Sequence, residues 1–123
     1  MITYTFNNDI KLLETYFKND IYLNDVLDYI NAIAENTQYP RTLKILTSAE
    51  KAVFKFTVAD LEHININKNE GLINYDYVMN AIIIDSPETA AISVLYEALA
   101  QNDKYKFKVF STKTYALNWL FNQ

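Results

Sequence analysis

The chain of 123 residues contains no cysteine and a single glycine, Gly71. Without cysteine it can form no disulfide, no thiolate metal site and no cysteine nucleophile. One glycine is too few for the loops that cradle phosphate groups, so the P-loop and the dinucleotide-binding fingerprint are both excluded. The chain has only two prolines and no low-complexity tract, so we expect one domain over residues 1–123.

Positive charge and long apolar runs are also scarce. The net charge is −4, whereas proteins that bind nucleic acids are usually basic, so we expect no nucleic-acid partner. The longest apolar run is residues 81–84, and a membrane span needs about 20 apolar residues. Residues 1–6 lack the basic start of a signal peptide. We therefore expect a cytoplasmic protein that does not span a membrane.

Hydrophobic residues make up half of the chain, and ten tyrosines and seven phenylalanines are among them. This content is sufficient for a large core. Ile2, Tyr4 and Phe6 alternate with threonines, which is the pattern of a half-buried strand. Residues 7–9 favour a tight turn, and residues 10–17 read as a second strand. The N-terminus is therefore predicted to form a β-hairpin.

The middle of the chain alternates between helical and extended patterns. Apolar residues between positions 23 and 34 recur at helical spacing and predict a helix, for which Asn24 is a candidate N-cap. Two extended segments and a short helix follow, and residues 70–79 are read as a helical turn containing Tyr75 and Val78. The extended segments are residues 43–47 and 51–56, and the short helix is residues 58–64 with Thr57 as its cap.

The C-terminal third carries the clearest signals. Residues 81–84 read as a strand buried on both faces. Ser86 and Pro87 are suited to begin the next helix, residues 106–110 form a last strand, and Ser111 caps a final helix. The first of these helices is predicted to bury a stripe of Ala90, Ala91, Val94, Leu95, Ala98 and Leu99. The predicted fold class is α/β, a mixed sheet of about five strands with helices packed on it.

The segments SPETAAISVLYEALA and KFKVFSTKTYALNWL resemble the end of SpoIIAA-like (STAS-like) domains. The matching residues are Ala116, Trp119 and Leu120, preceded by Val109 and Phe110. The resemblance implies a STAS-like fold and a binding or regulatory role without catalysis. Anti-sigma-factor antagonists of this type carry a phosphorylated serine in an Asp-Ser-Ser-Gly segment. Residues 55–59, the corresponding region, contain neither serine nor glycine, and Thr57 is their only hydroxyl residue.

Several residues have a functional and a structural interpretation. Thr57 is interpreted either as a phosphorylation site or as a helix cap. Asp85 and Ser86, which follow a strand, are interpreted either as part of a ligand site or as residues that cap the next helix. His63, the only histidine, would be the base of a small hydrolase or is structural. Asp25 and Asp28 form a carboxylate pair or a solvated helix face. Lys104, Lys106 and Lys108 form a basic row. The row either binds an acidic partner or prevents an edge strand from pairing with other chains.

Some SpoIIAA-like relatives are thought to hold hydrophobic ligands between sheet and helices. By this resemblance Tyr16, Phe54, Phe56 and Tyr77 would line such a space, and otherwise they are core residues. We therefore expect a non-enzymatic module that binds a partner protein or an apolar or amphipathic small ligand, without cofactor or metal. The alternatives are a phospho-switched regulator resembling anti-sigma-factor antagonists and a small hydrolase using His63, and a homodimer is compatible with each.

Overall fold

One mixed β-sheet organises the computed structural model, which describes residues 1–122. The strands follow chain order across the sheet, and β1 pairs antiparallel with β2 while the other neighbours are parallel. Their bounds are β1 Ile2–Asn7, β2 Leu12–Ile21, β3 Thr42–Phe54, β4 Tyr77–Ile83 and β5 Tyr105–Phe110. The predicted α/β class, five-stranded mixed sheet and N-terminal hairpin are confirmed.

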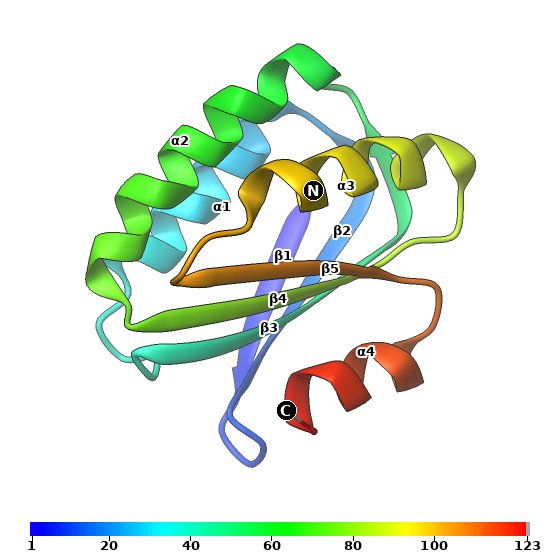
Figure 1. The fold of residues 1–123 in the computed structure, drawn as a ribbon. Helices are drawn as coiled ribbons and strands as arrows, with labels where there is room; N and C mark the ends of the chain where they lie inside the picture. The colour runs from blue at the N-terminus through cyan, green and yellow to red at the C-terminus, as the bar shows by residue number, and fades with distance from the viewer. Residues whose placement is uncertain (123) are drawn as a thin grey trace.

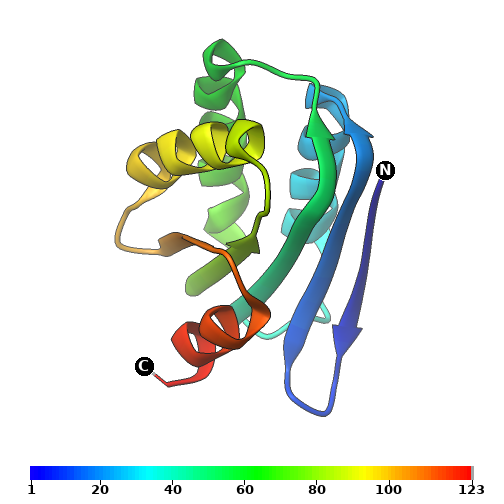
Figure 2. The same cartoon turned by 90° about the vertical axis from the view of Figure 1, so that its right-hand side faces the viewer.

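The helices cover the sheet unequally. Three of them, α1 (Leu23–Glu35), α2 (Leu61–Gly71) and α3 (Pro87–Ala100), lie on one face, and α4 (Lys113–Phe121) lies on the other (Figures 1 and 2). Two short 3₁₀ turns, η1 (Val58–Asp60) and η2 (Leu72–Asn74), flank α2. Each parallel strand pair is joined through one helix, as parallel pairing requires.

Two hydrophobic cores result from this layering. The larger core lies between the sheet and α1 to α3, and the smaller lies under α4. Strand β4 contributes Val78 and Ile82 to the larger core and Ala81 and Ile83 to the smaller. The prediction of a strand buried on both faces is thus confirmed, although the strand begins at Tyr77 rather than at residue 81.

Several predicted boundaries are wrong because pairing across the sheet extends the strands. The two extended segments of residues 43–56 form most of one continuous strand, β3. The helical turn predicted in residues 70–79 is confirmed as η2, but it excludes Tyr75 and Val78, since η2 ends at Asn74 and Val78 pairs with Leu43 in the sheet. Strand β2 begins at Leu12, because Ile10 lies in the hairpin turn, where Lys11 has a positive φ of 55°.

Two of the four predicted capping residues are confirmed, because Thr57 is the N-cap of η1 and Ser86 is the N-cap of α3. The Ser86 hydroxyl accepts a hydrogen bond from the Thr89 N–H at 3.3 Å, and Pro87 is the first residue of α3. Helix α1 begins after Tyr22 rather than at Asn24, and α4 is capped by Thr112 rather than by Ser111. Ser111 and Thr112 are adjacent and offer the same hydroxyl for capping, so the sequence alone does not choose between them.

The buried stripe predicted for α3 is wrong. The helix buries Thr89, Ser93, Tyr96 and Ala100, whereas Val94, Leu95 and Leu99 are about half exposed. Apolar residues surround most of this helix, so their spacing does not identify the face that meets the sheet. This rotation places a serine hydroxyl and a tyrosine against the sheet in the larger core.

Gly71 is required by a close approach of helices α1 and α2. A Cβ atom at this position would lie 2.9 Å from the Cβ of Ala34 in α1. A methyl group there would force the helices apart. The contact sets the position of α2, which carries Lys68 one turn before its end. None of the helices in residues 1–122 has the length and apolar character needed to cross a bilayer.

Candidate ligand-binding cavity

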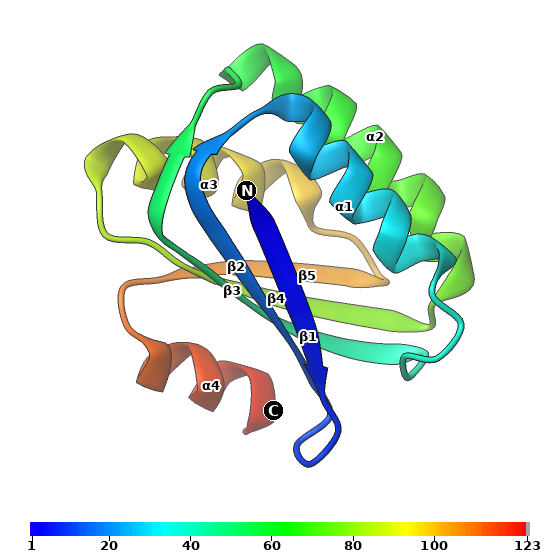
Figure 3. The ribbon, with the colours of Figure 1, turned by 180° about the vertical axis from the view of Figure 1, so that it is seen from behind.

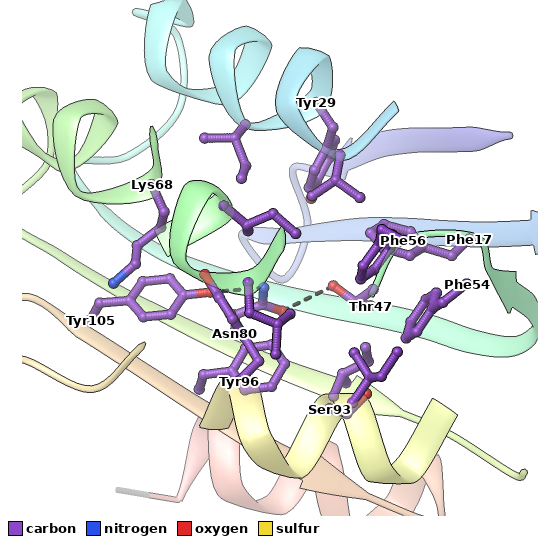
Figure 4. A pocket seen from close by; sticks show the side chains of 17 residues that line it. Phe17, Tyr29, Thr47, Phe54, Phe56, Lys68, Asn80, Ser93, Tyr96 and Tyr105 are labelled. Carbon is purple, nitrogen blue, oxygen red and sulfur yellow. Dashed lines mark hydrogen bonds between the residues drawn. The ribbon is translucent and has the colours of Figure 1, made fainter. Parts of the chain in front are cut away.

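A cavity of about 100 Å³ lies inside the larger core, between the sheet and the three helices that cover it (Figure 4). All four parallel strands and all three helices contribute to its wall, so it is a product of the tertiary fold. Aromatic and aliphatic side chains dominate the wall. The lining residues are Phe17, Val26, Tyr29, Ile30, Thr47, Phe54, Phe56, Leu61, Ile64, Lys68, Asn80, Ile82, Ile92, Ser93, Tyr96, Tyr105 and Phe107.

Aromatic rings form one end of the cavity. The rings of Phe54 and Phe56 stack with centroids 4.9 Å apart, and Phe17 meets Phe54 edge to face at 6.5 Å. At the other side Tyr96 of α3 stands perpendicular to Phe107 of β5 at 5.0 Å. Such contacts hold rings in fixed orientations and favour a preformed apolar space.

A chain of polar groups crosses the floor of the cavity. The Thr47 hydroxyl donates to the Asn80 Oδ1 at 2.9 Å, and the Asn80 Nδ2 donates to the Tyr105 hydroxyl at 3.2 Å, as Figure 4 shows. Burial raises the pKa of Tyr105 to about 12, against the opposing effect of its hydrogen bonds with Asn80 and Tyr96. The phenol is therefore neutral at physiological pH and is available to donate or accept a hydrogen bond.

The hydroxyl of Tyr29 meets Thr15 at the α1 side of the same space. The two oxygens lie 2.6 Å apart, and both residues are buried. Burial raises the pKa of Tyr29 well above its ordinary value. This hydroxyl is thus neutral and already hydrogen-bonded within the protein.

Ser93 places an unpartnered hydroxyl in the wall of the cavity. Its residue is 3% exposed, and its Oγ has no hydrogen-bond partner among the described residues. Leaving a buried hydroxyl without a partner costs about 1–3 kcal/mol. Among the residues that line the cavity, this oxygen is the clearest indication of a missing hydrogen-bonding group.

Replacing Ser93 by alanine tests whether that hydroxyl is unsatisfied in the free protein. We expect Ser93→Ala to raise the free energy of unfolding by about 1 kcal/mol, because it removes an unpaired polar group and alanine is the better helix former. Ser86→Ala on the same helix is the control, and we expect it to lower stability by about 1 kcal/mol through loss of the N-cap. Urea unfolding measures both, and destabilisation by Ser93→Ala would show that the hydroxyl is paired.

Lys68 is the one cation among the described residues that line the cavity. It is 6% exposed, its Nζ donates to the Ala100 carbonyl at 2.8 Å, and the ammonium lies 4.2 Å from the Tyr105 ring centroid. Among the described residues it has no carboxylate within ion-pair distance, and burial lowers its pKa to about 8. The ammonium is therefore a buried charge with only partial compensation.

A second, smaller cavity adjoins the first. It measures about 60 Å³ and extends towards η2 and the start of β4. The two spaces share the side chains of Tyr29, Ile30, Lys68, Asn80 and Tyr105. The polar groups of Lys68, Asn80 and Tyr105 thus stand at the junction between two apolar spaces.

The structure places two of the four predicted aromatic residues in the cavity. Phe54 and Phe56 line it, but Tyr16 is 40% exposed and Tyr77 packs against the smaller core under α4. Tyr16 is one residue away from Phe17, and neighbouring side chains of a strand point to opposite faces. The prediction that all four aromatics line one space is therefore corrected to Phe54 and Phe56.

The remaining predicted residues lie outside the cavity. Asp85, Thr57 and His63 are exposed, and Ser86 caps α3. Within residues 1–122 no side chain is hydrogen-bonded to His63, and no cluster of three potential metal ligands occurs. The Asp25 carboxylate accepts the Tyr22 N–H at 2.8 Å, so it belongs to the start of α1 rather than to a carboxylate pair.

The lysines of β5 lie where the structural interpretation places them. Strand β5 is an edge of the sheet, and Lys106 and Lys108 point away from the buried face formed by Tyr105 and Phe107. Charged side chains on an edge strand discourage pairing with other chains. Figure 3 shows the opposite edge, where β1 is the last strand.

Sequence reasoning missed the polar groups of the cavity. Asn80 directly precedes an apolar run, and Lys68 follows Leu61 and Ile64 at helical spacing on one face of α2. A lysine at an inward-facing helical position and an amide next to a buried strand are both unusual. The sequence therefore contains a signal for buried polar groups at these two positions. Ser93 and Tyr96 were missed because the buried face of α3 was misassigned.

No protein-family model matches the chain, and no curated protein sequence matches it. Its structure is similar to that of an uncharacterized protein of the DUF3478 family with a SpoIIAA-like fold from Shewanella loihica PV-4. The two share 15% identity and a TM-score of 0.61, over 98% of this chain and 92% of that one. This similarity and the five-stranded mixed sheet show that the chain has a SpoIIAA-like fold.

Proposed function

We propose that the protein is a non-enzymatic binding module that holds a small amphipathic molecule in the cavity beneath α1, α2 and α3. The observation that carries this proposal is the unpartnered Ser93 hydroxyl in an otherwise aromatic and aliphatic wall. Ligand sites typically combine apolar walls with a few convergent polar groups, and Asn80 and Tyr105 add to that set.

The cavity volume restricts the ligand to a small molecule. An apolar cavity of about 150 Å³ in another protein is sufficient for benzene. The cavity of about 100 Å³ and its neighbour of about 60 Å³ together match that scale. The expected ligand therefore has roughly five or six non-hydrogen atoms, a slim apolar part and one polar group.

Titration with 1-butanol tests this proposal. We expect millimolar binding, with amide NMR shifts concentrated on the strands and helices that line the cavity. Ser93→Leu fills the space from α3 and is expected to weaken binding at least tenfold, because the added carbons occupy the ligand volume.

Ala98→Leu is the matched control, since it adds the same kind of side chain on the exposed side of α3. It should leave butanol binding unchanged. Shifts confined to the surface groove near Tyr77 and Trp119, or equal binding to Ser93→Leu, would contradict the proposed cavity.

The phospho-switch at Thr57 is the less favoured alternative. The Thr57 hydroxyl donates to the Asp60 carboxylate at 3.4 Å, and the same carboxylate accepts the Thr57 N–H at 2.9 Å. A phosphate on Thr57 would replace this contact by repulsion between like charges. A hydrolase using His63 is disfavoured by its exposure and by the lack of a hydrogen-bonded acid among the described residues. A cytoplasmic location and the absence of catalysis are part of our proposal.

A further inference from the structure

We infer that Lys68 binds the carboxylate of a short amphipathic ligand, an inference that rests on the proposed function. The first argument is position. Lys68 lines both adjoining cavities and stands with Asn80 and Tyr105 where they meet. Figure 4 shows its amine beside the Tyr105 side chain, on the side of the cavity away from Phe54 and Phe56. A slim molecule with its apolar part among those phenylalanines would direct its polar end towards Lys68.

The second argument is unsatisfied hydrogen-bonding capacity. An ammonium group has three N–H donors, and Lys68 uses one of them on the Ala100 carbonyl. Within residues 1–122 no second acceptor bonds to its Nζ, although the Tyr105 ring offers a cation–π contact at 4.2 Å. A carboxylate would accept the remaining donors in short, charge-assisted bonds.

The third argument is charge. Among residues 1–122, no aspartate or glutamate lines either cavity, so none of them supplies a counter-charge to the ammonium there. A buried cation without a partner destabilises a fold, and the lowered pKa of Lys68 expresses that cost. One negative charge on the ligand would compensate one positive charge on the protein. A single carboxylate is therefore the matching group.

Among the described groups that line the cavities, we expect Lys68 to change its protonation state between pH 7 and 9.5. Lys104 lines neither cavity and donates to the Leu72 carbonyl, and Arg41 lies over the Tyr75 ring at 4.3 Å. The titratable groups that line the cavities are otherwise tyrosines, and burial raises the pKa of each one. These tyrosines are Tyr29, Tyr75, Tyr96 and Tyr105.

Comparing butyrate with 1-butanol tests the inference, because the two probes share an apolar chain and differ in charge. At pH 7 we expect the wild-type protein to bind butyrate about tenfold more tightly, which corresponds to one charge-assisted interaction. Between pH 7 and 9.5 the butyrate affinity should fall towards that of butanol, since the ammonium loses its proton around pH 8. Butanol binding should not change over this range.

Lys68→Met keeps the length of the side chain and removes its charge. We expect this variant to retain butanol binding and to lose the preference for butyrate. Lys104→Met is the matched control, because it removes a lysine that also donates to a backbone carbonyl but does not line either cavity. It should keep the tenfold preference.

The outcomes distinguish the role of Lys68 from the proposed binding of a ligand in the cavity. Equal binding of butyrate and butanol to the wild-type protein would overturn the role of Lys68 and leave the proposed cavity function standing. A preference for butyrate that persists in Lys68→Met would also overturn it. Binding of neither probe would overturn both. The pH titration of the wild-type protein decides the matter even if Lys68→Met does not fold.

Discussion

Leu120→Ala is expected to lower the free energy of unfolding by about 3 kcal/mol, within the range of buried leucine truncations. Leu120 is fully buried and attaches α4 to the sheet, where it packs in the cluster of Leu12, Leu46 and Met79. Helix α4 has nine residues, and so short a helix is marginal in water without tertiary packing. Truncation would therefore leave a cavity and also weaken the docking of the whole helix.

Urea unfolding followed by circular dichroism measures this effect. Tyr115→Ala on the same helix is the control, since Tyr115 is 66% exposed and its removal should cost less than about 0.5 kcal/mol. Because α4 and the ligand cavity lie on opposite faces of the sheet, folded Leu120→Ala should bind 1-butanol as the wild-type protein does. A loss below about 1 kcal/mol would mean that α4 contributes little to the fold.

Asn80→Ala is expected to cost about 2–3 kcal/mol, because it removes the centre of the polar chain on the cavity floor. Thr47 is 2% exposed, and its hydroxyl would lose its acceptor, while the Tyr105 hydroxyl would lose the Asn80 donor. A buried polar group that loses its partner costs more than the hydrogen bond contributed. The expected effect is a lower urea midpoint with an unchanged slope.

A second substitution tests the reason for that cost. Thr47→Val in the Asn80→Ala background removes the stranded hydroxyl while keeping its shape, so it should recover about 1 kcal/mol. In the wild-type background the same Thr47→Val change should destabilise, because it leaves the Asn80 oxygen unpaired. A double-mutant cycle in which the two substitutions are additive would show that the hydrogen bond does not couple them.

The sequence predicted the elements whose signals are local. Strict alternation at Ile2, Tyr4 and Phe6 identified β1, and the Ser86–Pro87 pair identified the start of α3. The order of strands and helices then restricted the fold class, and the SpoIIAA-like resemblance agreed with it. These features depend on local backbone conformation and on hydrophobic periodicity, and both are determined by residues that are close in the sequence.

The cavity could not be predicted in the same way. Its wall combines side chains from all three helices of one face with four strands, so its existence depends on how the helices are rotated against the sheet. For α3 the apolar residues lie all round the helix, and Ser93 faces inward only because the packed arrangement selects that side. Tyr16 was misplaced because of a local error on a strand. A shift of one position along a strand moves the side chain to the other face of the sheet.

The most direct test of the central claim is a crystal structure of the protein grown with 1-butanol. We predict ligand density between Ser93, Asn80 and the Phe54–Phe56 stack, with its hydroxyl within hydrogen-bond distance of the Ser93 oxygen. Side chains that close this space completely, or butanol bound only outside it, would contradict the claim that the fold encloses a ligand-binding cavity.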